Sequence, residues 1–160
     1  MFEVGDKVMY PMYGAGVIQA IQEKEILGKK QYYYMIHMPV VQLEVMIPVR
    51  KASDLGIRPV ADPMTLDEIL SQSAKEELDS SVKWNQRYRI YLEKIKTGNI
   101  QDEAEVIRDL AYRSKNKNLN FAERGVLNQA KQLFISELVL AKEITEIQAA
   151  HLLDQMTGKE

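Results

Sequence analysis

The chain has 160 residues, 46% of them hydrophobic, so it is long enough to bury a core in one domain or two small ones. It contains no cysteine, which excludes disulfides, thiolate catalysis and cysteine-based zinc sites. The net charge of −2 is unusual for a nucleic-acid binder, and no apolar run approaches the roughly 20 residues of a membrane helix. Since the first residues also lack the pattern of a secretion signal, we expect a cytoplasmic protein without membrane contact.

The first 50 residues predict short strands separated by turns. Four runs are rich in Val, Ile and Tyr, at residues 6–10, 16–21, 31–37 and 43–49. Four or five such strands with tight turns predict a small, strongly bent barrel. The last run alternates, which places Glu44 and Met46 on the face opposite Val45 and Ile47. That outward face is available to a partner.

A linker and a series of helices follow. Gly56, Pro59 and Pro63 mark the linker, and residues 65–68 resemble a capping box that opens a short helix. Further helices are expected over residues 83–97 and 101–115, after Asn120, and from Thr145 with an apolar stripe through Ile147, Ala150, Leu153 and Met156. The sequence therefore predicts an α+β protein, with a β-domain over residues 1–62 and an all-α domain over residues 63–160.

Trp84 is the only tryptophan, and it lies in a basic stretch that has five cations and one anion between residues 83 and 96. An aromatic ring flanked by cations suits stacking or wedging against a nucleic-acid base. Helical spacing also places Trp84 on one face with Tyr88 and Tyr91, which is ordinary core spacing. Asn85 is a good N-cap residue and would leave Trp84 just outside the helix, so the pattern allows both interpretations.

No constellation for catalysis or cofactor binding is visible. Gly14-Ala15-Gly16 lies between strands and lacks the following helix of a dinucleotide-binding loop. His37 and His151 fall in different predicted domains without metal-ligand spacing. We therefore expect no enzyme activity, metal, cofactor or small-molecule substrate.

Several segments carry a resemblance through their order and spacing. They are residues 2–11 with 14–16, 84–89 with 92–94 and 97–98, 105–110, 122–124, and 130–134 running to 137–138. Together they resemble the CarD/CdnL family of bacterial transcription regulators over essentially the whole chain. The resemblance implies a Tudor-like N-terminal domain that binds the RNA polymerase β subunit, and a helical domain that touches promoter DNA at the upstream edge of the bubble.

The resemblance also implies roles for individual residues in DNA binding. In the family a tryptophan wedges into the minor groove at the upstream fork, and basic residues around it hold the backbone. Those roles fall here on Trp84 as the wedge and on Arg87, Arg89, Arg113 and Arg124 as phosphate contacts. A protein that holds the fork favours the melted promoter, the open complex, over the closed one.

The polymerase-binding roles fall on Lys24 and Met46, beside Ile26 on the neighbouring strand and with Glu44 next to Met46. Better-known members of the family place arginines at the positions of Lys24 and Met46. Because a methionine cannot form a salt bridge, the resemblance predicts a weaker or more apolar polymerase interface here.

Two other functions are compatible with the sequence. The first is a polymerase-binding adaptor whose helical domain binds another protein through its aromatic stripe rather than DNA. The second is a small hydrolase that uses the scattered carboxylates, which we disfavour because no paired acid and base can be assigned.

Overall fold

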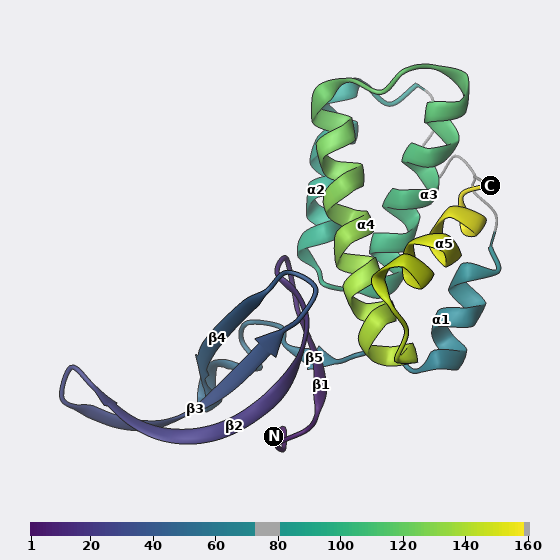
Figure 1. The fold of residues 1–160 in the computed structure, drawn as a ribbon. Helices are drawn as coiled ribbons and strands as arrows, with labels where there is room; N and C mark the ends of the chain where they lie inside the picture. The colour runs from purple at the N-terminus through teal and green to yellow at the C-terminus, as the bar shows by residue number, and fades with distance from the viewer. Residues whose placement is uncertain (73–80, 159–160) are drawn as a thin grey trace.

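The computed structural model describes residues 1–72 and 81–158. These residues form a curved antiparallel sheet followed by a bundle of helices that packs against one end of it (Figure 1). The α+β prediction is therefore confirmed. Among the described residues, no helix is both long enough and apolar enough to cross a membrane.

The sheet has the strand order β4-β3-β2-β1-β5, and every neighbouring pair is antiparallel. The strands are β1 (Lys7–Tyr10), β2 (Gly14–Ile26), β3 (Lys29–Met38), β4 (Leu43–Pro48) and β5 (Arg58–Pro59), with a short 3-10 helix, η1 (Val49–Lys51), after β4. The β2–β3 hairpin turns at Leu27 and Gly28, where φ is +52° and +78°. A two-residue hairpin turn favours positive φ at both positions, which glycine adopts without strain.

Two features of the sheet differ from the sequence prediction. The β2–β3 hairpin is longer than expected, because its ladder continues through the exposed polar residues 22–25 and 29–30 that show no apolar alternation. The expected linker also contains a strand, since Arg58 pairs with Met9 and Pro59 with Val8. Pro59 lies on the edge strand, where its missing N–H is tolerated.

The helices are α1 (Pro63–Leu70), α2 (Trp84–Lys96), α3 (Ile100–Asn116), α4 (Phe121–Lys142) and α5 (Glu146–Met156). Asn120 and Thr145 open α4 and α5 with complete capping boxes, as expected. The capping box expected at residues 65–68 is wrong. Asp62 caps α1 instead, accepting a hydrogen bond of 2.9 Å from the Thr65 amide. Ile147 is also misassigned: it is 83% exposed, and Ala149 is buried in its place.

The described residues form two hydrophobic cores. The smaller one lies inside the sheet and contains Val8, Ile18, Tyr34, Ile36, Met38, Ile47, Ala52 and Ile57. The larger one fills the helical bundle, and two residues of the sheet, Met9 and Ala15, belong to it. The helical core is therefore completed by side chains from β1 and β2.

Candidate nucleic-acid interface

Trp84 is the first residue of α2, and Lys83 holds the N-cap position without a side-chain cap. The expectation that Asn85 caps the helix is therefore wrong, and Trp84 lies inside the helix. Its side chain is nevertheless 49% exposed. It stacks on Tyr88, one turn later, with ring centroids 5.8 Å apart. Trp84 thus presents one ring face to Tyr88 and a large part of its surface to solvent.

Arg87 does not lie on the surface, which corrects its expected role as a phosphate contact. It is 2% exposed, and its Nη1 lies 4.0 Å from Oδ2 of the buried Asp109 on α3. Its Nη2 donates a hydrogen bond of 3.1 Å to the Val82 carbonyl, just before Trp84. The Tyr91 hydroxyl donates to the same Asp109 carboxylate, and burial raises the pKa of Tyr91. Arg87 therefore anchors the start of α2 from within the bundle.

The other three arginines differ in exposure. Arg89 on α2 and Arg124 on α4 are exposed, whereas the Arg113 side chain is only 11% exposed. The Arg113 Nε lies 3.7 Å from Glu123 Oε2. Arg124 Nη1 donates a hydrogen bond of 3.1 Å to the Leu119 carbonyl. Arg89 and Arg124 thus have the exposure that a phosphate contact requires, while Arg113 is largely buried beside a carboxylate.

A cleft of about 310 Å³ opens beside Trp84. Trp84 begins α2, and the amino end of α2 lies at the end of the bundle farthest from the sheet (Figure 1). The cleft is lined by Val82, Trp84, Arg87, Arg113, Lys117, Asn118, Asn120 and Glu123. A second cleft, of about 280 Å³, shares Asn118 and includes Arg124 and Lys131. The first cleft brings together the amino ends of α2 and α4, whose peptide dipoles favour anions. Arg89 lines neither cleft.

The structure adds site residues beyond those expected from the sequence. Lys117 and Asn118 reach the cleft from the segment after α3, and Phe121, the first residue of α4, is 85% exposed. Lys117 belongs to a basic group visible in the sequence, but its proximity to Trp84 depends on how α3 and α4 pack. Phe121 could have been found, because its neighbours at i+3 and i+4, Arg124 and Gly125, lie outside the apolar stripe.

The four residues expected to contact polymerase are all exposed. Strand register places Lys24, Ile26, Glu44 and Met46 on the same face of the sheet, because directly paired residues share a face. They nevertheless fall into two separate groups, Lys24 with Ile26 on β2 and Glu44 with Met46 on β4. Met46 pairs across to Met35 and through it to Ala20, whereas Lys24 lies four residues farther along β2. That separation is about 13 Å along the strand.

The expected neighbourhood of Ile26 and Met46 is therefore wrong. The strand β3 lies between β2 and β4, and Ile26 pairs with Lys29 at the tip of the hairpin. Glu44 and Met46 instead lie on β4, which is an edge strand of the sheet. The Glu44 Oε1 lies 3.4 Å from His37 Nδ1 on the neighbouring strand.

Comparison with known proteins covers both halves of the chain. Residues 2–61 match the domain family described as CarD-like/TRCF RID domain, and residues 67–154 match CarD, C-terminal domain. The chain is 48% identical over 148 residues to the putative transcription factor YdeB of Bacillus subtilis (strain 168), covering 92% of this chain and 97% of that protein. The chain belongs to the CarD-like family.

A solved structure in the family is also similar to part of this CarD-like chain. It is the solution NMR structure of the 72-residue N-terminal domain of Myxococcus xanthus CarD, which is 32% identical. The similarity covers 37% of this chain and 79% of that one, with a TM-score of 0.33.

Membership in the CarD-like family makes this chain a transcription factor and not an enzyme. The RID domain implies RNA polymerase binding by the N-terminal half. The RID match includes β5 and ends just before α1, so Arg58 belongs to the RID. Trp84 and its cleft lie in the part that matches the CarD C-terminal domain.

Proposed function

We propose that this CarD-like transcription factor binds the RNA polymerase β subunit through its RID and stabilises the promoter open complex with Trp84 at the upstream fork of the bubble. Residues 1–62 carry the polymerase contact and residues 63–160 the DNA contact. The observation that carries the proposal is the state of Trp84, which is 49% exposed yet stacked on Tyr88 and anchored at the start of a packed helix. A wedge needs both exposure and a rigid support.

Charge around Trp84 supports promoter DNA as the partner. Lys83, Lys117 and Arg124 are exposed at this end of the bundle, and Glu123 is buried. Overall the protein has a net charge of −2, so the basic character is local. Contacts between such basic side chains and DNA neutralise phosphates and release counterions, which gives affinity with little base specificity. The exposed ring of Phe121 offers a second stacking surface beside Arg124.

The proposed mechanism is a shift between two promoter states. A ring inserted at the fork contacts bases that are unstacked only in the melted promoter, so Trp84 binds the open complex more tightly than the closed one. Polymerase binding by the RID holds Trp84 near the fork and raises its effective concentration there. The protein therefore acts in the cytoplasm of a bacterium, where polymerase and promoters meet.

The test is the lifetime of the open complex, measured with purified polymerase and the full chain. Stacking on one base is worth about 1 to 3 kcal/mol, so Trp84→Ala should shorten the lifetime by about one to two factors of ten. Phe121→Ala should shorten it less, and Ile147→Ala, a matched loss of an exposed apolar side chain on α5, should leave it unchanged.

Two results would contradict the proposal. An unchanged lifetime with Trp84→Ala would remove the wedge and favour the adaptor function, in which the helical domain binds a protein. A loss of several kcal/mol of folding stability in the same variant would show that Trp84 acts as a core residue.

A further inference from the structure

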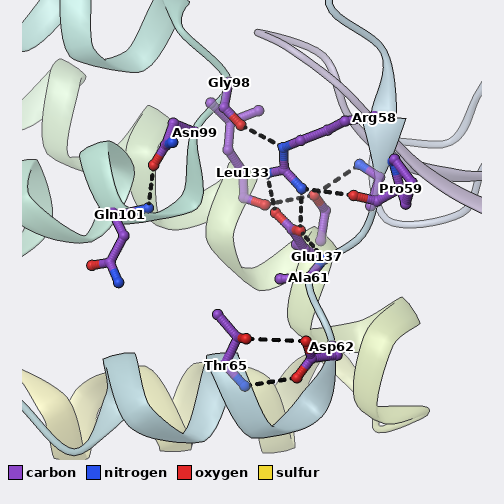
Figure 2. Close-up of polar contacts among 12 residues, drawn as sticks. Arg58, Pro59, Ala61, Asp62, Thr65, Gly98, Asn99, Gln101, Leu133 and Glu137 are labelled. Atoms are coloured by element: carbon purple, nitrogen blue, oxygen red, sulfur yellow. Dashed lines mark hydrogen bonds and ion pairs between the residues drawn. The ribbon is translucent and has the colours of Figure 1, made fainter.

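A partly buried polar contact joins the RID to the helical domain (Figure 2). It includes Gly98, just after the carboxyl end of α2, whereas Trp84 is the first residue of that helix. Arg58 of β5 donates two hydrogen bonds to Glu137 of α4, of 2.7 Å from Nη1 to Oε2 and 2.8 Å from Nη2 to Oε1. Its Nε donates a hydrogen bond of 2.9 Å to the carbonyl of Gly98, which lies between α2 and α3. The Ala61 amide donates a hydrogen bond of 2.7 Å to Glu137 Oε2. One side chain of the RID thus contacts two places in the helical domain.

Strand pairing fixes the position of Arg58 relative to the sheet. Arg58 pairs with Met9 in the β1–β5 ladder, so its backbone moves with the RID. Glu137 is 0% exposed and lies in the middle of the second half of α4. A two-point arginine–carboxylate pair holds both distance and angle, whereas apolar packing has no preferred direction. The Arg58–Glu137 pair therefore restrains the orientation of the two domains.

The turn at Gly98 lies close to the RID as well. It has φ of +71°, and a Cβ at this position would lie 2.6 Å from Pro11 Cγ in the β1–β2 connection. Since Gly98 immediately precedes the N-cap of α3 and follows α2, the contact determines where α2 ends relative to the sheet. Trp84 is at the other end of α2, about 20 Å away by helix rise. A tilt of about 10° at Gly98 would displace Trp84 by about 4 Å, which is about the thickness of one base.

We infer that Arg58 and Glu137 are positioning residues that set the angle between the RID and the helical domain, and thereby the reach of Trp84 from polymerase to the fork. The effect on orientation stands on the contacts alone. The effect at the promoter rests on the proposed function, because it requires that Trp84 act at the fork.

The orientation is measured in the full chain with two spin labels. The chain has no cysteine, so cysteines placed at the exposed Lys51 in the RID and Gln132 on α4 are labelled without background. Glu137→Gln, which keeps the size and an acceptor, should broaden the distance distribution between the labels. Lys7→Met is the matched control, because it removes the exposed domain-crossing ion pair to Glu143, of 3.2 Å, and should leave the distribution narrow.

A second variant keeps the test valid if Glu137→Gln does not fold. The double change Arg58→Met with Glu137→Met removes both charged partners and leaves no uncompensated buried charge, so it should retain the fold. Circular dichroism checks the fold of each variant. A narrow, parent-like distribution in both folded variants would overturn the inference.

Open-complex lifetimes then test the functional part. In the variants the lifetime should approach that of Trp84→Ala, a fall of about one to two factors of ten, while polymerase affinity stays within about twofold of the parent. A broadened distribution with a parent-like lifetime, in conditions where Trp84→Ala shortens it, would overturn the positioning role. If Trp84→Ala itself has no effect, the proposed function fails, and the label distances still decide whether the pair sets the orientation.

Discussion

Trp84 and Tyr88 stack on α2 with their ring planes 6° from parallel and their centroids 5.8 Å apart. The pair is formed between side chains one helical turn apart, so it orders the Trp84 ring before any partner arrives. An aromatic pair of this kind is worth about 0.5 to 1.5 kcal/mol beyond its buried area. Tyr88 is therefore expected to reduce the entropy that Trp84 loses on binding.

Replacing Tyr88 tests this support. Tyr88→Ala should increase the mobility of the Trp84 ring, and Tyr88→Phe should preserve the stack. Because Trp84 is the only tryptophan, its fluorescence anisotropy decay reports the motion of this ring alone. The open-complex lifetime should fall in Tyr88→Ala by less than in Trp84→Ala. Equal ring mobility in the parent and Tyr88→Ala would show that the stack does not hold the ring.

The exposed arginines should act through charge alone. If Arg89 and Arg124 each bind one phosphate, then Arg89→Ala or Arg124→Ala should flatten the slope of log affinity against log salt by about 0.9 on duplex DNA. The measurement is DNA affinity of the polymerase-bound protein across a salt series, on two unrelated promoters. A parent-like slope would remove that arginine from the interface, and weaker binding at only one promoter would indicate base reading.

Arg87 should behave differently from those two arginines. It is buried beside Asp109, and breaking a buried ion pair by removing one partner costs about 3 to 5 kcal/mol. Arg87→Met should therefore lower the free energy of unfolding by several kcal/mol, as measured by denaturant titration. A stable Arg87→Met variant with a flattened salt slope would show that Arg87 binds phosphate after all.

Met46 tests the polymerase interface on β4. Its side chain is 37% exposed, so burying this exposed part against polymerase should contribute about 1 kcal/mol to binding, or roughly fivefold in Kd. Met46→Ala should weaken binding to polymerase equally at low and high ionic strength, since an apolar contact is not screened by salt. Leu43→Ala is the matched control, because Leu43 lies on the same strand but on the opposite face. Unchanged affinity in Met46→Ala would place the interface elsewhere.

Glu103 predicts a pH dependence of stability. It is fully buried, and burial together with the nearby Glu137 carboxylate raises its pKa well above the ordinary 4.5. The folded state therefore keeps this proton at pH values where the unfolded chain has released it. The stabilising contribution is present below pH 4.5 and is lost as pH rises through the raised pKa.

Glu103→Gln removes that titration. The variant should unfold at higher denaturant concentration than the parent at pH 8, and the difference should shrink as the pH falls toward 4.5. Denaturant titrations at several pH values provide the measurement. A parent-like pH dependence in Glu103→Gln would show that Glu103 is already ionised in the folded protein.

Local chemistry explains which parts of the fold could be predicted from sequence. Asn120 and Thr145 are recognisable as helix caps because a cap depends on residues three positions away. The strand β5 escapes prediction because its two residues are defined by pairing with β1, about fifty positions earlier, and not by their own pattern. Pairing of that kind leaves no periodic signal.

The site shows the same division between local and tertiary information. Periodicity leaves Trp84 open between core and surface, since one face of a helix can be buried at one end and exposed at the other. The expected role of Arg87 is wrong because its partner, Asp109, lies on another helix. The two separate groups on the sheet cannot be distinguished until strand register places Ile26 away from Met46.

Met9 and Ala15 belong to the sheet by their backbone and to the helical core by their side chains. A change that unfolds the helical bundle therefore exposes apolar surface of the sheet as well, and the reverse is also true. The two domains should melt together in one cooperative transition of the full chain. Genetic screens would consequently recover loss-of-function substitutions in both halves, through lowered abundance, even where the substituted residue contacts neither polymerase nor DNA.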